Sequence, residues 1–357
     1  MKGAARAVID TRALQHNLER VRAAAPAARV MAVVKANAYG HGIEPVARAL
    51  ARVDALAVAR VEEGRRVRAA GFDKPVVLLE GVFSAEQLAL AAQQDFEIVV
   101  HCAEQIELLS THRGRPLGVW LKLDSGMHRL GLAPEDFAAA AQALAASAAV
   151  AAPIRLMTHL ANADDPADPT SREQIRLFEH LTQGHAGERS IANSAGLLAW
   201  PDSHADWVRP GLMLYGASPL VQSTAAELGL EPVMAFTTDL IALKTVRAGA
   251  RVGYGGRWTA ALDTRVGIAA VGYGDGYPRS LDNGTPVLIR GKRVPMIGSV
   301  SMDMITLDLT DCPEARVGDP VVLWGPGLPV EEIAARAGTI AYELLCNVSQ
   351  RVDLEIT

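Results

Sequence analysis

Short runs of valine, isoleucine and leucine alternate with helical patterns through the first 216 of the 357 residues. Near-continuous apolar strands that alternate with helices are typical of a parallel sheet covered on both faces. Strands are predicted at residues 30–35, 55–59, 76–79, 97–100, 118–123, 154–159, 189–192 and 207–214. Helices are predicted between them at residues 43–52, 61–70, 84–93, 103–110, 134–148 and 171–183. Eight such units predict an α/β protein with an N-terminal (β/α)8 TIM-type barrel.

An open, doubly wound parallel sheet is the competing architecture. No GxGxxG follows the first predicted strand, which weakens the dinucleotide-binding version of that fold. After residue 230 the pattern becomes rich in short strands with glycine and Asp-Asn-Gly turns, as in "TPVLIRGKRVPMIGSV". We therefore predict two domains, a barrel over residues 1–230 and a mostly β domain over residues 231–357, joined near residues 221–232.

Composition narrows the classes of function. Lysine and arginine number 35 against 40 acidic residues, so the net charge is −5, and without a basic stripe nucleic acid is not an expected partner. The three cysteines show no CxxC spacing, which favours reduced thiols in the cytoplasm over disulfides or a zinc site. The most apolar stretch, residues 137–152, falls short of the roughly 20 residues that span a membrane, and no secretory signal is expected at the start.

Polar residues gather where the predicted strands end, which is where a barrel of this kind builds its site. Each has an ordinary explanation taken alone: a strand-end lysine that reaches water, a buried core histidine, a loop arginine, a helix cap or a turn. Several such features at one rim favour a site instead. The residues concerned are Lys35 and Tyr39 after the first strand, Lys122 and Arg129 at the fifth, His159 at the sixth, Asn193 and Ser194 at the seventh, and Arg209, Gly211 and Leu212 at the eighth.

The chemistry of this set indicates a phosphorylated aldehyde. A lysine shifts its pKa readily on burial and forms Schiff bases with carbonyl compounds. Loops after the last two strands of such barrels often hold phosphate, and here they offer the Ser194 hydroxyl and the backbone N–H groups near Gly211. An amine at one strand and a phosphate cradle at two others predict pyridoxal 5′-phosphate (PLP) as cofactor.

Motifs along nearly the whole chain resemble those of the fold-type III PLP enzymes, and most closely the alanine racemase family. In the first domain they are "VVKANAYGHG", "KLDSGMHRLG" and "RPGLMLYG"; in the second they are "VGYGG", "GYGDGY", "GSVSMDM" and "AYELLC". No single motif is specific, but their shared order is. The resemblance implies an isomerase that interconverts L- and D-alanine for peptidoglycan metabolism, in either the synthetic or the degradative direction.

The resemblance also implies a role for each matching residue. Lys35 would hold PLP and act as the base on one face of the substrate Cα, and Tyr254 of the partner in a head-to-tail homodimer would act on the other. Phosphate contacts would come from Tyr39, Ser194, Gly211, Leu212 and Tyr342, with Asn193 beside them. Arg209 would face the pyridine nitrogen with His159 behind it. Arg129 and the Met302 backbone N–H would contact the substrate carboxylate, with Asp303 nearby.

The two-base arrangement has a physical rationale. Racemisation breaks a Cα–H bond on one face and re-forms it on the other, so one base serves poorly. Lys35 and Tyr254 have ordinary pKa values of about 10 and need cationic neighbours or desolvation to work near neutral pH. An arginine does not readily give up its proton, so we expect Arg209 to leave the ring nitrogen unprotonated and to suppress side reactions.

Tyr254 and Tyr342 at the entrance would leave room for a methyl side chain, which favours alanine over serine modestly, by roughly 1–3 kcal/mol for each added group.

A decarboxylase on the same barrel would place a carboxylate where Arg209 lies. A non-catalytic PLP carrier would resemble the barrel half alone, and a barrel without PLP would leave Lys35 a coincidence.

Four positions depart from the family pattern as we know it: Ser125, Leu160, Gly253 and Ser301. None removes a group that the mechanism needs, although Gly253 would loosen the loop that carries the second base. Lys122 matches a lysine that family members carry as a carbamate. The alternative is an unmodified lysine paired to an acid such as Asp124.

Overall fold

Eight parallel strands close into a barrel in the computed structural model, which describes residues 4–357. Most of the strands are buried on both faces because their residues are apolar without alternation, as in Ala-Leu-Ala-Val of β3, whereas the first part of β7 is exposed. Pairing of Arg29 with Trp207 joins the first barrel strand to the last. The strands are β2 (Arg29–Val33), β3 (Ala55–Val58), β4 (Val76–Leu78), β5 (Phe96–Val100), β6 (Leu117–Lys122), β7 (Val150–Met157), β8 (Arg189–Ser190) and β9 (Trp207–Val208). The predicted barrel is thus confirmed.

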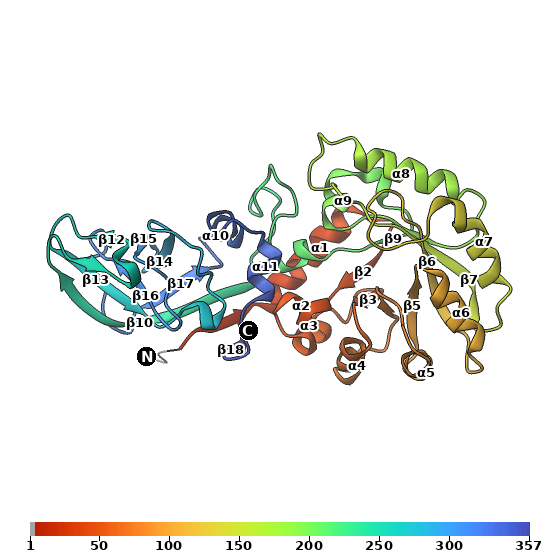
Figure 1. Ribbon diagram of the computed structural model, residues 1–357, viewed down its shortest axis with the longest axis horizontal. Helices are drawn as coiled ribbons and strands as arrows, with labels where there is room; N and C mark the ends of the chain where they lie inside the picture. The colour runs from red at the N-terminus through yellow and green to blue at the C-terminus, as the bar shows by residue number, and fades with distance from the viewer. Residues whose placement is uncertain (1–3) are drawn as a thin grey trace.

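Helices surround the barrel (Figure 1). Helix α1 begins after Asp10, whose carboxylate accepts hydrogen bonds from two N–H groups of the first turn. The others are α2 (Lys35–Tyr39), α3 (Ile43–Ala49), α4 (Val61–Ala69), α5 (Ala85–Gln93), α6 (Ala103–Thr111), α7 (Pro134–Ala145), α8 (Thr170–Leu181) and α9 (Ser194–Ala199), and α1 itself spans Thr11–Ala24. Within residues 4–357 no helix has the length and apolar character to cross a bilayer.

The second domain is built on an eight-stranded sheet with the order β13-β16-β15-β14-β17-β10-β1-β18. Figure 1 shows it at the opposite end of the molecule from the barrel. Its elements are β1 (Arg6–Ile9), β10 (Met234–Val246), β13 (Thr264–Ala269), β14 (Pro286–Ile289), β15 (Lys292–Ile297), β16 (Ile305–Asp308), β17 (Pro320–Trp324) and β18 (Asp353–Ile356), with the hairpin β11 (Arg251–Val252) and β12 (Trp258–Thr259) and helices α10 (Val330–Ala337) and α11 (Ala341–Cys346). The mostly β character predicted for this domain is confirmed.

Strand β1 lies within the range 1–230 predicted for the barrel, but it belongs to the second sheet. It pairs antiparallel with β10 and parallel with β18. Its four residues bury alternate side chains, which is the pattern of a strand with one covered face and not of a barrel strand. The chain therefore starts in the second domain, builds the barrel and returns.

The last predicted strand, 207–214, is shorter in the structure. Strand β9 ends at Val208, and residues 212–215 form the 3-10 helix η2 (Leu212–Tyr215). All four η2 side chains are buried, so their apolar run looks like a strand although the backbone is helical.

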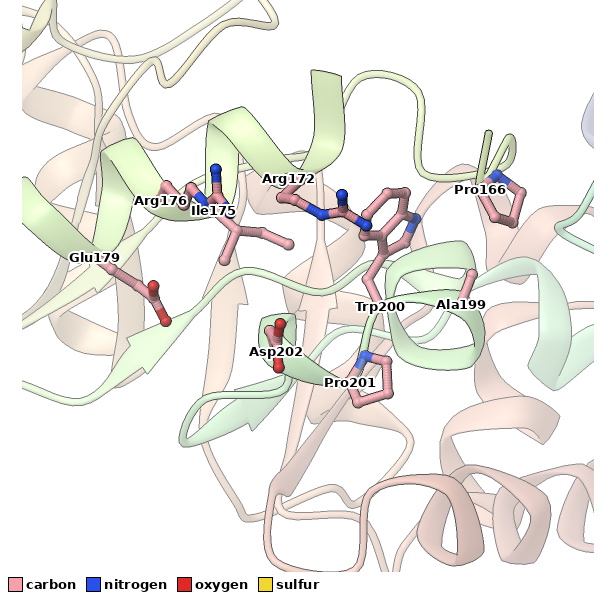
Figure 2. A pocket seen from close by; sticks show the side chains of 9 residues that line it. All are labelled: Pro166, Arg172, Ile175, Arg176, Glu179, Ala199, Trp200, Pro201 and Asp202. Atoms are coloured by element: carbon pink, nitrogen blue, oxygen red, sulfur yellow. The ribbon is translucent and has the colours of Figure 1, made fainter. Parts of the chain in front are cut away.

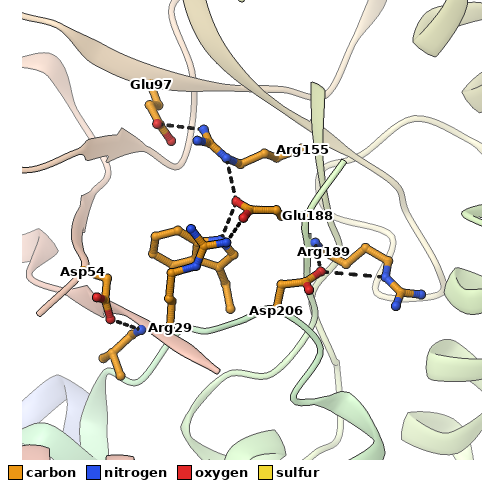
Figure 3. A network of polar contacts seen from close by, with 9 residues as sticks. Arg29, Asp54, Glu97, Arg155, Glu188, Arg189 and Asp206 are labelled. Atoms are coloured by element: carbon orange, nitrogen blue, oxygen red, sulfur yellow. Dashed lines mark hydrogen bonds and ion pairs between the residues drawn. The ribbon is translucent and has the colours of Figure 1, made fainter. Parts of the chain in front are cut away.

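A polar network lies near the amino ends of the barrel strands, away from the end where the candidate residues lie (Figure 3). The Arg155 guanidinium contacts Glu97 at 2.7 Å and Glu188 at 3.1 Å. The indole N–H of Trp120 donates to Glu97, and that of Trp207 donates to Glu188. These paired charges occupy the barrel end where residues usually serve stability and not chemistry.

Candidate active site

The candidate residues of the barrel meet at the carboxyl ends of its strands. Lys35 follows β2, Lys122 ends β6, His159 follows β7 and Arg209 follows β9. Because all barrel strands are parallel, these ends form one mouth. The clustering predicted from the sequence is therefore present in the fold.

The backbone turns left-handed immediately after Lys35. Residues 36–39 have φ values between 52° and 55°, and none of them is glycine. Such a conformation costs an L-residue roughly 1–2 kcal/mol. The chain forms the short helix α2 here, with a left-handed interior. This turn sets the spacing between Lys35 and Tyr39, so its cost is tolerated at the site.

Burial and the Arg129 guanidinium lower the pKa of the Lys35 amine, while Glu80 and Glu63 act in the opposite direction. Lys122 is 7% exposed, and burial followed by Arg209, Arg129 and Lys35 lowers its pKa to about 8. Both lysines thus have a larger neutral fraction near neutral pH than a surface lysine, and a neutral amine can act as a nucleophile or a base.

Lys122 forms no ion pair within residues 4–357, although the charge of Asp124 raises its pKa against the larger lowering effects. Asp124, the acid named as its alternative partner, accepts hydrogen bonds from the backbone N–H groups of Gly126 and His128 and contacts the His128 ring at 3.2 Å. Asp124 therefore acts on Lys122 through its charge and not through an ion pair. The reason is that Asp124 stabilises its own loop, as aspartates in turns commonly do.

Burial of Lys122 predicts a pH-dependent stability. Its pKa is about 8 in the folded chain against 10.5 when exposed, so between these values the unfolded chain binds the extra proton. Stability of the apo-protein should therefore rise from pH 8 to 10.5, by at most about 3 kcal/mol. Lys122→Met should lose this rise and be more stable than wild type below pH 8. Thermal unfolding in carbonate-free buffer measures both, and parallel pH curves for the two proteins would contradict the prediction.

Arg209 is fixed by acceptors and carries no carboxylate partner within the described chain. It is 4% exposed and donates to the Ser190 hydroxyl at 2.6 Å and to the carbonyls of Thr158 at 2.5 Å and Ile191 at 3.1 Å. Burial lowers its pKa to about 10, so it stays charged at neutral pH.

His159 lies behind this arginine. Its Nδ1 is 3.3 Å from the Arg209 guanidinium. Burial and then the charge of Arg209 lower the pKa of His159 well below its ordinary value. The ring is therefore neutral, and Nδ1 can accept from Arg209.

Ser194 and Gly211 form a compact cradle between α9 and η2. The Ser194 hydroxyl oxygen accepts from the N–H of Gly211 at 2.8 Å and of Met213 at 3.4 Å, so its own hydrogen remains free to donate outward. A Cβ at Gly211 would lie 2.4 Å from the Tyr39 hydroxyl. Tyr39 is held by stacking on Tyr215, with ring centres 4.6 Å apart. An outward hydroxyl donor beside a position where only glycine fits suits a small anion such as a phosphate group.

Three more predicted cofactor residues border this cradle. Leu212, buried, begins η2 directly after Gly211. Tyr342 comes from α11 of the second domain, its ring 5.8 Å from that of Tyr39, and burial raises its pKa to about 12. The Asn193 side-chain oxygen accepts the Gly196 N–H at 2.8 Å and caps α9, so the helix-cap interpretation holds for that oxygen.

Tyr254, Met302 and Asp303 lie outside this mouth. The strands β11 and β12 on either side of Tyr254 are at the end of the second domain remote from the barrel (Figure 1). Tyr254 is 71% exposed and Met302 53% exposed. Asp303 forms an ion pair with Arg351 at 2.6 Å. One chain by itself therefore does not bring these residues to Lys35.

Several residues that hold the site carry no recognisable signal in the sequence. Ser190 and Tyr215 are a buried hydroxyl and a buried ring inside apolar segments, where an ordinary core role is the default interpretation. Glu63 in the first turn of α4 looks like a helix-capping acid. The Thr158 carbonyl could not have been identified, because backbone acceptors carry no sequence signal.

A separate cavity lies on the outer surface, between α8 and residues 199–202 (Figure 2). The Arg172 guanidinium lies 5.8 Å from the centre of the Trp200 ring there. None of the predicted site residues lines this cavity, so it is not the candidate active site.

Comparison with known proteins gives a consistent result. The family model of the alanine racemase N-terminal domain matches residues 9–219, and that of the C-terminal domain matches residues 233–356. Alanine racemase from Vibrio cholerae is 51% identical over 352 residues, 98% of each chain. The crystal structure of biosynthetic alanine racemase from Pseudomonas aeruginosa has a TM-score of 0.96 at 46% identity over 99% of each chain. That of alanine racemase from Streptomyces lavendulae has a TM-score of 0.92 at 34% identity, over 100% of this chain and 98% of the other. The chain belongs to the alanine racemase family.

Proposed function

We propose that this chain interconverts L- and D-alanine, the activity of its family, with PLP bound at the barrel mouth. The observation that carries the proposal is the junction of Lys35 with the cradle of Ser194, Gly211 and Tyr39. The Lys35 amine has a lowered pKa, as a lysine that forms a Schiff base requires. The Ser194 hydroxyl keeps its hydrogen free to donate, because its oxygen accepts the N–H groups of Gly211 and Met213, and only a glycine fits at position 211 beside the Tyr39 hydroxyl. The residues present thus fit the aldehyde and phosphate ends of PLP.

When bound, PLP supplies an electron sink that acidifies the Cα–H of an amino acid. The chain's own residues would then hold and move protons. Lys35, whose neutral fraction is increased by burial and by Arg129, would accept a proton at Nζ on one face. Arg209, held by three oxygen acceptors, would present a fixed donor to the ring nitrogen. A barrel-type decarboxylase would need a carboxylate in that place, so this alternative is not favoured.

We infer that the second base comes from a partner chain in a homodimer. The support is the exposure of Tyr254 at 71% and of Met302 at 53%, together with the place of β12, which follows Tyr254, at the end of the second domain remote from the barrel (Figure 1). Large apolar and aromatic side chains that are exposed together commonly mark interfaces. Tyr254 would face Lys35 of the other chain, and Arg129 and the Met302 N–H would bind the substrate carboxylate, with Asp303 beside them.

A carbamate on Lys122 would suit its surroundings. Carbon dioxide reacts with the neutral amine, and the lowered pKa of about 8 makes that form available. The resulting negative charge would lie near Arg209 and Arg129, whose positive charges now oppose the ammonium. The carbamate would thus turn repulsion into attraction and orient Arg129.

The proposal is tested by incubating the purified holoenzyme with L-alanine in D2O. D-alanine that carries deuterium at Cα, absent with Lys35→Ala, is the expected result. Exchange at Cα without D-alanine would mean that one face works and that Tyr254 is not the second base. No exchange despite bound PLP would contradict racemisation, and a protein that binds no PLP would contradict the cofactor.

The biological setting follows from the substrate and is also a proposal. D-alanine is a component of peptidoglycan, and the enzyme would supply or degrade it. The free cysteines Cys102, Cys312 and Cys346 support a reducing compartment, the cytoplasm.

A further inference from the structure

Several hydrogen bonds fix the backbone of the left-handed turn after Lys35. Within it, the N–H of Ala38 donates to Val34 at 2.9 Å and that of Gly40 donates to Ala36 at 3.0 Å. The N–H of Ala36, the first after Lys35, points out of the turn and donates to a side chain. Its acceptor is Glu63 Oε1 on α4, at 2.6 Å.

The two oxygens of Glu63 have different partners. Oε2 accepts the N–H groups of Ala59 at 2.9 Å and Arg60 at 3.2 Å, which caps the start of α4. That is the ordinary task of an acid at this helix position. The contact of Oε1 with Ala36 is additional, and it joins α2, which follows β2, to α4. A carboxylate is needed, because a carboxamide has one acceptor oxygen.

A second set of hydrogen bonds fixes Asn37, the next residue of the turn. The side-chain oxygen of Asn37 accepts the Ile43 N–H at 3.1 Å and an Arg66 N–H at 2.8 Å. Arg66 is itself fixed by two contacts with Glu44, at 2.7 Å and 2.9 Å. Both Glu63 and Arg66 come from α4, so this helix sets the position of the turn.

We propose that Glu63 is a positioning residue for Lys35: its carboxylate holds the Ala36 N–H and so aims the Lys35 amine into the barrel mouth. The proposal rests on the proposed function, because it takes Lys35 as the residue that PLP and the substrate meet. Glu63 itself does not touch the reacting atoms. It acts through the first peptide group after the lysine, where a small backbone rotation displaces the amine at the end of its long side chain.

The test compares Glu63→Gln with Glu62→Gln, a matched change at an exposed residue one position earlier on α4. Glu63→Asp serves as a second variant, which keeps a carboxylate in the first turn of α4 but shortens its reach. The first readout is the rate at which apo-protein captures PLP at Lys35, trapped with borohydride and identified by peptide mass spectrometry. The second is hydrogen–deuterium exchange of the peptide over residues 33–42 in apo-protein. The third is the pair kcat and KM for alanine, with Tm recorded alongside.

We expect both Glu63 variants to capture PLP at Lys35 about tenfold more slowly and to lose about tenfold or more in kcat, since small displacements of a reacting group cost at least this much. KM should change by less than about threefold, and exchange over residues 33–42 should accelerate. Glu62→Gln should match wild type in every readout.

Two results would overturn the proposal. Glu63 variants with a lowered Tm but wild-type capture, exchange over residues 33–42 and kcat would show that the carboxylate only caps α4. Failure of the wild-type protein to capture PLP at Lys35 would overturn the proposed function, and this inference with it.

Discussion

A mixture of two inactive variants, Lys35→Ala and Tyr254→Phe, is expected to regain about a quarter of wild-type activity. If each site takes Lys35 from one chain and Tyr254 from the other, the mixed dimer has one site with both defects and one intact site. Random exchange makes half of the dimers mixed, so about one site in four works. Alanine racemisation after refolding the two variants together measures this.

Each variant alone provides the baseline. Tyr254→Phe removes a proton-transferring hydroxyl and should lower kcat by about 10²–10⁴-fold. Lys35→Ala removes both the attachment point and a base, so its loss should be at least as large. If both residues served one site within one chain, every site in a mixed dimer would carry one defect. Activity would then stay at the level of the separate variants, which would contradict the shared site.

Gly211→Ala is expected to weaken PLP binding by about 5- to 150-fold. The added Cβ would lie 2.4 Å from the Tyr39 hydroxyl oxygen and 3.1 Å from the ring carbon that bears it. Overpacking of this kind costs about 1–3 kcal/mol. Titration of apo-protein with PLP, followed by absorbance, gives the Kd.

The double variant Gly211→Ala with Tyr39→Phe separates crowding from other causes. Loss of the Tyr39 hydroxyl removes the closest atom but leaves the ring carbon at 3.1 Å, so part of the affinity should return. If the double variant binds PLP less tightly than Gly211→Ala, the tyrosine hydroxyl contributes more to binding than it costs in space. A Gly211→Ala protein with wild-type affinity would mean that the cradle is not the phosphate site.

The barrel could be predicted because each of its strands has a local signature. Runs such as Ala-Leu-Ala-Val at residues 55–58 are apolar on every side chain, and such segments lie between two covered faces. Strand β1 could not be assigned to its sheet in this way. Its partners are β10 and β18, far along the chain, and a four-residue pattern does not identify the strand with which it pairs.

The site residues also fall into those that have a local sequence signal and those that do not. Lys35, Arg209 and Ser194 belong to the first group, because the fold of a barrel does not need polar groups at its strand ends. The left-handed backbone at residues 36–39 was not, because alanine and asparagine there give no glycine signal. Glu63 escaped notice because helix capping explains an acid at its position completely. The additional contact appears only when two distant backbones are placed side by side.

The position of β1 between β10 and β18 has a consequence for synthesis of the chain. The sheet of the second domain needs the first strand and the last one together, while all barrel strands lie between them. On the ribosome the barrel can therefore close early, whereas β1 must wait for β10 and gains its second neighbour only when β18 emerges. A single proteolytic cut at the joint near residue 225 would not release two complete domains. Strand β1 would stay on the barrel fragment but remain paired with β10 and β18 of the other fragment.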